Sequence, residues 1–374
     1  MTGPARPGDW LLTDEPHRFG SGWLSGTVGA LLGLAGLGAA ACLAWPDALT
    51  TPALRAHWPA ALPQWTAACL LVAAALGAVS LGLRRKKTLG LVALAAAVLG
   101  AALLVALPQR PPGGGPGVVA VDALVLNLLL YPLVFLPLER LSPLRDQPTF
   151  RPEWPTDLAW FVASALFVQV TTALVLAPGN ALAGALPAAR TALGGLPLLL
   201  QLPLVVLVAD LAQYWIHRAC HRLPWLWRFH AIHHSATAMD WLAGSRLHVV
   251  DALLTRALVY AAIAALGFDL AAIAAYLAFV GAQATFVHAN VRWDLRWLEP
   301  WLVTPRIHHW HHADALPDGN FAVHLPWLDR VFGTLQLPPA GWPARYGLAG
   351  GVAGPRGFWR QLLTLRPKDD ATAA

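Results

Sequence analysis

The chain has 374 residues, of which 57% are apolar and only 12% are Asp, Glu, Lys or Arg, and its mean hydropathy is +0.52. Soluble domains carry about 25% charged residues, so this composition excludes a water-soluble globule. The abundance of large apolar side chains excludes an intrinsically disordered chain. The formal net charge of +6 comes from basic residues scattered through apolar sequence, which membrane topology explains better than a nucleic-acid partner does. We expect an integral membrane protein that binds no nucleic acid.

Apolar runs long enough to cross a bilayer recur along the chain. A spanning helix needs about 20 residues, and six runs approach or exceed this length. They cover residues 23–45, 65–83, 88–107, 118–138, 158–177 and 196–216. A further pair, 253–266 and 270–287, is shorter, so it predicts a hairpin that need not cross fully. The predicted fold class is an all-α, polytopic membrane helix bundle.

The basic residues in the loops orient these spans. With the N-terminus in the cytoplasm, nine Lys and Arg fall in cytoplasmic loops and three fall outside, which the positive-inside rule favours. The run that ends at Ile216 then ends on the cytoplasmic side, where the later segments form a helical cap. A high content of Ala, Leu, Gly and Arg with only three Lys is typical of a GC-rich bacterial genome. The predicted location is therefore the bacterial inner membrane.

A segment rich in proline and glycine, PQRPPGGGPG at 108–117, interrupts the helical pattern because neither residue type sustains a helix. It predicts a division into a three-helix membrane region at 1–110, a linker at 111–117, a core at 118–340 and a tail at 341–374. The first region offers no cluster of chemically active side chains, so we assign it no chemistry. The widely spaced cysteines indicate buried thiols rather than disulfides or a zinc–thiolate site; they are Cys42, Cys69 and Cys220.

Eleven of the fourteen histidines fall between positions 217 and 312, and most of them form three clusters. Residues three and four apart share a helix face, so each cluster points imidazoles in one direction, and the three faces can converge on one centre. The clustered histidines are His217, His221, His230, His233, His234, His308, His309, His311 and His312. His248 and His288 stand alone, as packed core histidines commonly do. Packing does not explain three clusters at one membrane edge, whereas neutral imidazole is the commonest metal ligand.

The number of imidazoles indicates two metal ions. A structural zinc site closes with four ligands, and a catalytic site uses about three plus water, so eight or more clustered histidines exceed what one ion binds. The clusters lack the Glu-x-x-His motif of the soluble di-iron bundles. Imidazole suits iron, zinc, copper and nickel alike, so the ligand type leaves the identity of the metal open.

The order of these motifs resembles that of the fatty acid hydroxylase and sterol desaturase superfamily. The resemblance covers residues 209–338 and rests on three histidine boxes, HRACH at 217–221, HAIHH at 230–234 and HHWHH at 308–312. The flanking residues that match are Asp210, Tyr214, Trp215, Ser235, Arg246, His248, His288, Asn290, Thr304, Pro305, Arg306, Asn320 and Phe321. Because three spaced boxes occur in order, the match is specific.

This resemblance implies a membrane-bound, non-haem di-iron oxidoreductase that uses O2 to hydroxylate or desaturate a C–H bond of a fatty acyl, sterol-like or related lipid. Electrons would come from a separate ferredoxin or cytochrome with its reductase, because the sequence contains no flavin or nicotinamide fingerprint. Carried over by position, the implied metal ligands are His217, His221, His230, His233, His234, His248, His288, His308, His311 and His312.

Some positions depart from the family pattern. Many relatives have His-Pro and Glu where residues 248–251 are His-Val-Val-Asp, and some have a histidine where Arg292 stands. His309 points off the shared face of its box, so we assign it to the surroundings of the ligands. Candidates for orienting a ligand imidazole, with an ordinary packed polar contact as the alternative, are Asp210, Tyr214, Asn290 and Asn320.

Two other functions fit a membrane protein rich in histidine. A metal transporter or metal-binding protein would need ionisable residues along its spans, and the first five predicted spans have almost none. A zinc-dependent membrane hydrolase would need the HExxH motif with its general base, which is absent. The lipid, the electron donor and the choice between hydroxylation and desaturation stay open at this point.

Overall fold

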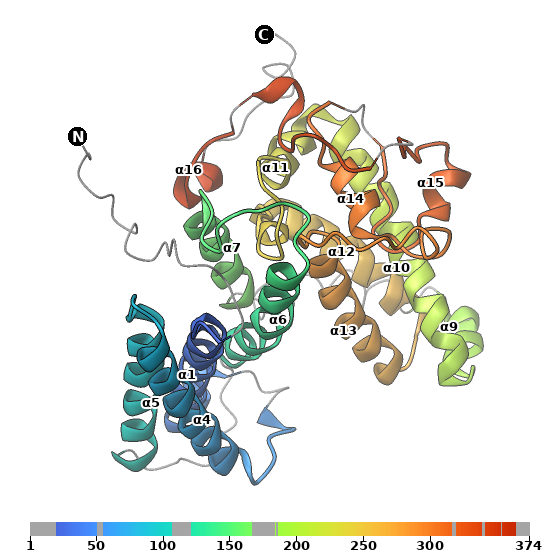
Figure 1. Cartoon of the computed structure of the whole chain (residues 1–374). Coiled ribbons are helices and arrows are strands. Elements are labelled where there is room, and N and C mark those ends of the chain that lie inside the picture. Colours follow the sequence, from blue (N-terminus) through green and yellow to red (C-terminus); the bar gives the residue numbers. More distant parts are fainter. Residues whose placement is uncertain are drawn as a thin grey trace, which may run out of the picture. The chain divides into compact units, whose positions relative to one another are not determined.

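The computed structural model describes residues 20–50, 55–106, 121–166, 184, 186–315, 319–338, 341–352 and 354–363. Over these residues the secondary structure is helical, apart from one isolated antiparallel bridge between Ala313 and Tyr346 (Figure 1). The all-α prediction is therefore confirmed. The predicted linker at 111–117 and the end of the tail lie outside the described residues, and the division into four parts stays a prediction.

Two compact units make up the chain, and the first comprises Met1–Pro152 and Val162–Val170. Its helices are α1 (Trp23–Ala44), α2 (Pro46–Leu49), α4 (Leu62–Leu83), α5 (Thr88–Ala106) and α6 (Val121–Leu141). α1, α4 and α5 pack on one another. A Cβ atom at Gly33 would lie 3.0 Å from the carbonyl oxygen of Ala93, so the small residue allows the two backbones to approach. Apolar helices in lipid associate through such close packing.

The second unit comprises Glu153–Phe161 and Thr171–Ala374. Three apolar helices form its centre, α10 (Leu198–Arg222), α12 (Val249–Leu266) and α13 (Leu270–Phe286), and α10 packs on the other two (Figure 1). Val205, Ile263 and Tyr276, one from each helix, belong to one buried apolar cluster. The shorter helices of this unit are α9 (Pro187–Gly194), α11 (Pro224–His234), η1 (Ala243–Ser245), α14 (Pro305–His311), α15 (Trp327–Val331), η2 (Ala349–Gly351) and α16 (Phe358–Leu363).

Six helices are long and apolar enough to cross a membrane, which supports a multi-pass membrane protein: α1, α4, α5, the Leu124–Leu141 part of α6, α10 and α12. α12 has 18 residues because it begins before the predicted start at 253, so the expectation of a short first hairpin helix was wrong. α13 has 17 residues. Only part of the predicted span 158–177 is described, where α7 (Trp154–Leu166) crosses from one unit into the other.

α10 does not end at the predicted boundary, Ile216. It continues without a break to Arg222, so that His217 and His221 lie one helical turn apart near its end. Proline at the first position of α11 then starts the next helix immediately. This tight junction brings the first two histidine boxes close together.

Two buried carboxylates hold the loop that follows the third histidine box. Asp210 of α10 accepts hydrogen bonds from the backbone N–H groups of Val323, His324 and Leu325 at 2.6–3.1 Å. Asp329 of α15 accepts those of Phe321 and Ala322 at 2.8 and 2.9 Å. Because these N–H groups lie in a loop without regular structure, the carboxylates take the place of secondary-structure partners. The loop is thereby fixed against α10.

The three cysteines are free thiols. Cys42 and Cys220 are buried, as predicted. Cys69 is only half-buried, because it lies on the part of α4 that α1 incompletely covers, and its Sγ donates to the carbonyl oxygen of Leu32 at 3.4 Å. The prediction of a fully buried thiol was wrong for this residue.

Candidate metal centre

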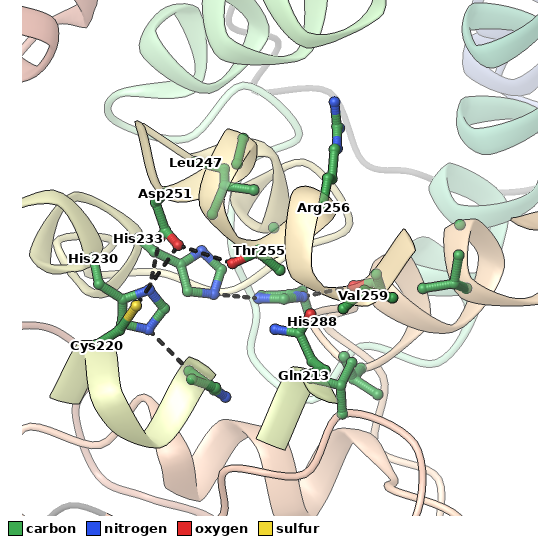
Figure 2. A pocket seen from close by; sticks show the side chains of 18 of the residues that line it. Gln213, Cys220, His230, His233, Leu247, Asp251, Thr255, Arg256, Val259 and His288 are labelled. Atoms are coloured by element: carbon green, nitrogen blue, oxygen red, sulfur yellow. Dashed lines mark hydrogen bonds and ion pairs between the residues drawn. The ribbon is translucent and has the colours of Figure 1, made fainter. Parts of the chain in front are cut away.

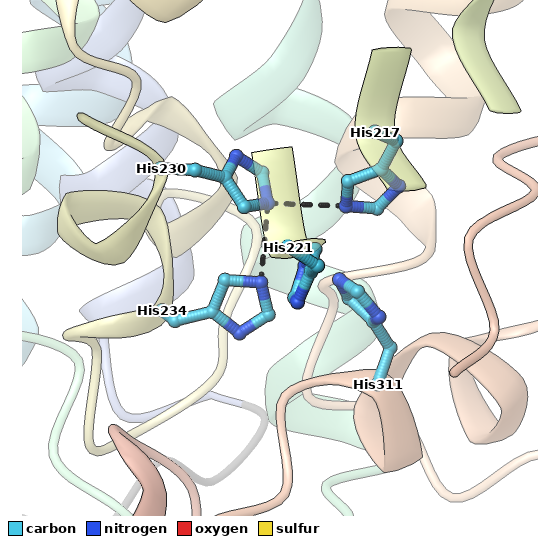
Figure 3. A group of neighbouring side chains, drawn as sticks. All are labelled: His217, His221, His230, His234 and His311. Carbon is cyan, nitrogen blue, oxygen red and sulfur yellow. Dashed lines mark hydrogen bonds between the residues drawn. The ribbon is translucent and has the colours of Figure 1, made fainter. Parts of the chain in front are cut away.

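Nine of the ten histidines predicted as metal ligands gather in two groups within the second unit. The five-histidine group contains His217, His221, His230, His234 and His311, and the four-histidine group contains His233, His288, His308 and His312. Within each group the potential ligand nitrogens all lie within 4.8 Å of one another. Each of the nine side chains is buried, with at most 8% of its residue surface exposed. Figure 3 shows the rings of the five-histidine group turned toward a common centre.

Helical spacing distributes the histidines between the two groups. On α11, His230 and His234 are four residues apart and enter the five-histidine group, while His233 enters the other. On α14 and its C-cap, His308 and His312 are four residues apart and enter the four-histidine group, while His311 enters the first. Since two helices each supply both groups, the groups lie side by side. His217 and His221 come from α10, and His288 follows the end of α13.

Backbone carbonyl oxygens orient four of the imidazoles through Nδ1. His217 donates to Phe321 at 2.7 Å and His311 donates to Gly319 at 2.7 Å. In the other group, His233 donates to Arg246 at 3.1 Å and His288 donates to Ala284 at 2.7 Å. A carbonyl oxygen only accepts, so each Nδ1 carries the ring proton and each Nε2 presents a lone pair. Second contacts of this kind are what fix metal-ligating histidines.

Asp251 orients a fifth ring. Its Oδ2 accepts from Nδ1 of His230 at 2.8 Å, and Thr255 and Cys220 lie near the other carboxylate oxygen at 3.3 and 4.0 Å. Cys220, His230 and Asp251 also form a third set of possible ligands. Because Nδ1 of His230 faces Asp251, its Nε2 is turned to the five-histidine group, and we interpret the third set as support for that ring.

The lone pairs of neighbouring rings face one another at short range. Nε2 of His217 lies 3.1 Å from Nε2 of His230, and Nε2 of His288 lies 3.4 Å from Nε2 of His233. No proton is available between these atoms, since each ring carries its proton on Nδ1. A metal ion with nitrogen ligands at about 2.1 Å holds neighbouring ligand nitrogens about 3.0–3.4 Å apart. The described residues of both groups therefore fit a bound metal ion.

Protonation does not offer an alternative at neutral pH. Burial, reinforced by the neighbouring imidazoles, holds the pKa of His233, His308 and His312 well below the usual value. Burial alone lowers the pKa of His288 to about 4. Nε2 of His311 is buried and has no hydrogen-bond partner among the residues that the structure describes. A group of neutral imidazoles with opposed lone pairs is suited to a cation other than the proton.

The structure places His248, the tenth predicted ligand, in neither group. Its Nδ1 accepts from the backbone N–H of Val250 at 3.2 Å and caps α12, and its Nε2 donates to the carbonyl oxygen of Leu362 at 3.2 Å. Both ring nitrogens are thus engaged by backbone groups, which leaves no lone pair for a metal. His309 lies outside the groups as expected, with its Nδ1 2.8 Å from the hydroxyl of Tyr346.

The side chains predicted to orient imidazoles mostly hold loops instead. Asp210 binds the backbone N–H groups of the 323–325 segment, and Tyr214 shares a hydrogen bond of 2.9 Å with Thr334. Asn320, at a positive φ of 57°, donates to the carbonyl oxygen of Gln336 at 2.8 Å and accepts from its N–H at 2.7 Å. Asn290 is buried two residues beyond His288. Of these four, none shows a hydrogen bond to a grouped imidazole among the contacts described above.

Sequence reasoning missed the residues that perform this role. Asp251 drew attention only as a departure from the family pattern, and the carbonyl donors of Arg246, Gly319 and Phe321 leave no signature because every residue has one. A buried acidic residue within the first turn of a helix next to the histidine boxes is the signal that could have identified Asp251.

A cavity of about 310 Å³ opens beside both groups. His217, His230, His233, His288 and His308 line it on one side. Residues of α10, α12 and α13 line the rest, among them Val259, Tyr276, Val280 and Ala284 (Figure 2). The cavity thus joins a cluster of polar ligands to walls contributed by membrane helices, as suits an apolar molecule.

Replacing Asp251 tests its proposed support of His230. We expect Asp251→Asn to weaken metal binding by the five-histidine group about 10- to 100-fold, as losses of such partners do, because the amide keeps the shape of the carboxylate but not its charge. Competition with a chelator at fixed pH measures this change. Asp294→Asn, at an exposed carboxylate paired with exposed Arg296, is the matched control, and an unchanged affinity in the Asp251 variant would contradict the assignment.

Comparison with known proteins places the site in a family context. Residues 202–334 match the family model of the fatty acid hydroxylases. An ornithine lipid hydroxylase of Rhizobium tropici is 34% identical over 171 residues, which are 44% of this chain and 50% of the relative. A putative methylsterol monooxygenase of Dictyostelium discoideum is 25% identical over 52% of this chain and 73% of its own length. An alkylglycerol monooxygenase of Danio rerio is 32% identical over 35% of this chain and 29% of its own length.

The matched region contains all nine grouped histidines. The chain spans about half the length of the first of these relatives. No solved structure matches the chain significantly.

Proposed function

On the premise that residues 202–334 belong to the fatty acid hydroxylase superfamily, we propose that this protein is a di-iron oxidoreductase of the membrane that oxidises a lipid. It would use O2 and external electrons to hydroxylate or desaturate a C–H bond. The observation that carries the proposal is the pair of adjacent groups of neutral imidazoles beside a cavity walled by membrane helices. Imidazole alone does not select iron, so the choice of metal rests on the family.

Two iron ions, when bound, would supply the redox chemistry that activates O2. The nine histidines would hold them, five around one ion and four around the other. The carbonyl oxygens and Asp251 keep the protons on Nδ1, so that every oriented ring presents Nε2. Rings held in this way need no rearrangement to bind metal. The remaining ring faces are packed against one another, which limits the space for water.

The cavity would bind the lipid and exclude water. Its apolar wall from α12 and α13 offers surface for hydrocarbon, and its histidine side places a C–H bond near the metal ligands. A site from which water is excluded protects a strong oxidant from side reactions. Because the walls are helices that can cross a bilayer, the lipid would enter from the membrane.

We place the histidine groups on the cytoplasmic side of a bacterial inner membrane, from the distribution of Lys and Arg in the loops. Electrons would then come from a separate cytoplasmic or membrane donor, such as a ferredoxin or a cytochrome with its reductase.

Elemental analysis of the purified, detergent-solubilised protein tests the metal. Together with Mössbauer spectroscopy on iron-57-grown cells, we expect about two iron ions per chain and a coupled di-iron signal, since each histidine group fits one ion. Zinc alone after iron-replete growth, with no uptake of iron on reconstitution, would contradict the proposal. Comparison of lipids from a deletion strain and its complemented parent then identifies the product, which gains one oxygen atom in hydroxylation or loses a pair of hydrogens in desaturation.

A further inference from the structure

One cationic side chain lines the cavity at membrane depth. Arg256 belongs to α12, a helix long and apolar enough to cross a membrane, and it lies seven residues beyond the start of that helix. This position is about 10 Å along the helix axis. Ionisable residues inside membrane helices are rare and usually face a cavity in which they act. Arg256 is therefore a candidate for contact with a ligand.

The other groups around the cavity do not duplicate this charge. Among the described residues that line it, Arg256 is the lone Arg or Lys. The lining histidines His233 and His308 are neutral, because burial lowers their pKa. Asp251, the lining carboxylate, is engaged with His230 and Thr255. The cavity thus combines apolar walls with a single guanidinium, which can form bidentate, charge-assisted hydrogen bonds to an oxyanion.

The position of Arg256 relative to the histidines suits one orientation of a lipid. Asp251, which orients His230, lies five residues before Arg256 on the same helix, or about 7.5 Å along its axis. In Figure 2 the side chain of Arg256 extends away from the labelled histidines. A molecule held by Arg256 could therefore reach the histidines with a hydrocarbon segment. Tyr260, one turn further on α12, also lines the cavity and can donate a hydrogen bond.

We propose that Arg256 binds the anionic group of the lipid substrate, a carboxylate or a phosphate. This proposal rests on the proposed function, because it assigns the substrate of the same cavity. It selects lipids with an acidic head over neutral lipids of equal chain length, since a neutral head would leave the guanidinium without an anion in a site of low polarity. Arg256 is thus a residue that determines specificity, and it holds no metal.

Binding of matched amphiphiles tests the proposal without any turnover. The metal-loaded full chain, in phosphatidylcholine nanodiscs without oxygen or reductant, is titrated with dodecanoate, dodecyl phosphate or dodecanol, which share one chain. The dependence of thermal stability on ligand concentration gives each affinity. We expect at least one charged probe to bind about tenfold more tightly than dodecanol. The better charged probe then distinguishes a carboxylate from a phosphate.

Variants connect this preference with Arg256. Arg256→Gln should reduce the affinity for the charged probe about tenfold and leave that for dodecanol unchanged, while Arg256→Lys should keep part of the preference. Arg330→Gln, at an exposed position of α15, is the matched control and should behave as the parent. Equal binding of dodecanol and both charged probes by the parent, or an unchanged preference in both Arg256 variants, would overturn the proposal.

The lysine variant keeps the test decisive if the glutamine variant does not fold, since Lys retains the charge but lacks the planar guanidinium. Failure of this proposal is distinguishable from failure of the proposed function. A preference that depends on Arg256 in a protein without iron would retain the anion site and reject the di-iron enzyme. A di-iron centre without the preference would reject the anion site alone.

Discussion

His233→Ala and His311→Ala are each expected to remove metal from one histidine group and to abolish lipid oxidation, while the protein stays inserted in the membrane. Each ring is buried, is oriented through Nδ1 by a backbone carbonyl oxygen and presents Nε2 to its group. Loss of a ligand should cost more metal affinity than the roughly 10- to 100-fold that loss of an outer partner costs. His233 comes from the smaller group, so its variant should lose metal more completely.

Metal content, chelator competition and product formation measure these effects. His57→Ala provides a matched control, because His57 is exposed and belongs to the first unit, away from both groups in sequence. It should keep the metal content and activity of the parent. Full activity in either group variant after loss of its metal would contradict the di-iron proposal. Loss of inserted protein instead of metal would show that the histidine is needed for folding.

Asp157→Ala is expected to lower the free energy of unfolding by about 3–5 kcal/mol, the range for a buried ion pair that loses one partner. Asp157 and Arg246 are both fully buried and form an ion pair. Arg246 also contacts Glu153 at 2.9 Å, a carboxylate that is 22% exposed, so we expect the lower part of that range. Denaturant unfolding of the detergent-solubilised protein measures the change.

The same substitution should also weaken metal binding by the four-histidine group. The carbonyl oxygen of Arg246 accepts from Nδ1 of His233 at 3.1 Å, and its guanidinium donates to Ser235 at 3.2 Å. Movement of Arg246 would therefore disturb the orientation of His233. Asp294→Ala is the control, since its pair with Arg296 is exposed and such pairs contribute little. Equal stability of both variants would show that the buried pair does not hold this loop.

Local sequence properties predicted the helices and the histidine faces well. The lengths of apolar runs identified α1, α4, α5 and α10 within a few residues, because a bilayer requires about 20 apolar residues in succession. The prediction was weaker for α12, whose first turn contains Asp251. That carboxylate interrupts the apolar run, yet the helix begins before it since His248 caps the first turn and His230 pairs with Asp251.

Contacts distant in the sequence were beyond prediction. The tail beyond residue 340 appeared to have no role, but Gln361 of α16 accepts from the indole N–H of Trp160 at 2.8 Å and donates to the carbonyl oxygen of Pro355 at 2.9 Å. Leu362 supplies the carbonyl oxygen that engages His248. These contacts depend on how loops dock, which hydrophobic periodicity does not encode.

The sequence by itself determined the membrane class, the number and type of the metal-binding side chains, and which of them share a helix face. These properties depend on composition and on spacings of three and four residues, which a helix converts directly into geometry. Only the tertiary structure decided that five histidines form one group and four the other, that His248 belongs to neither, and that Asp251 and backbone carbonyl oxygens set the tautomers. Such contacts join positions 21 to 104 residues apart, as between His230 and Asp251 or His217 and Phe321, and they exist because the packed helices bring them together.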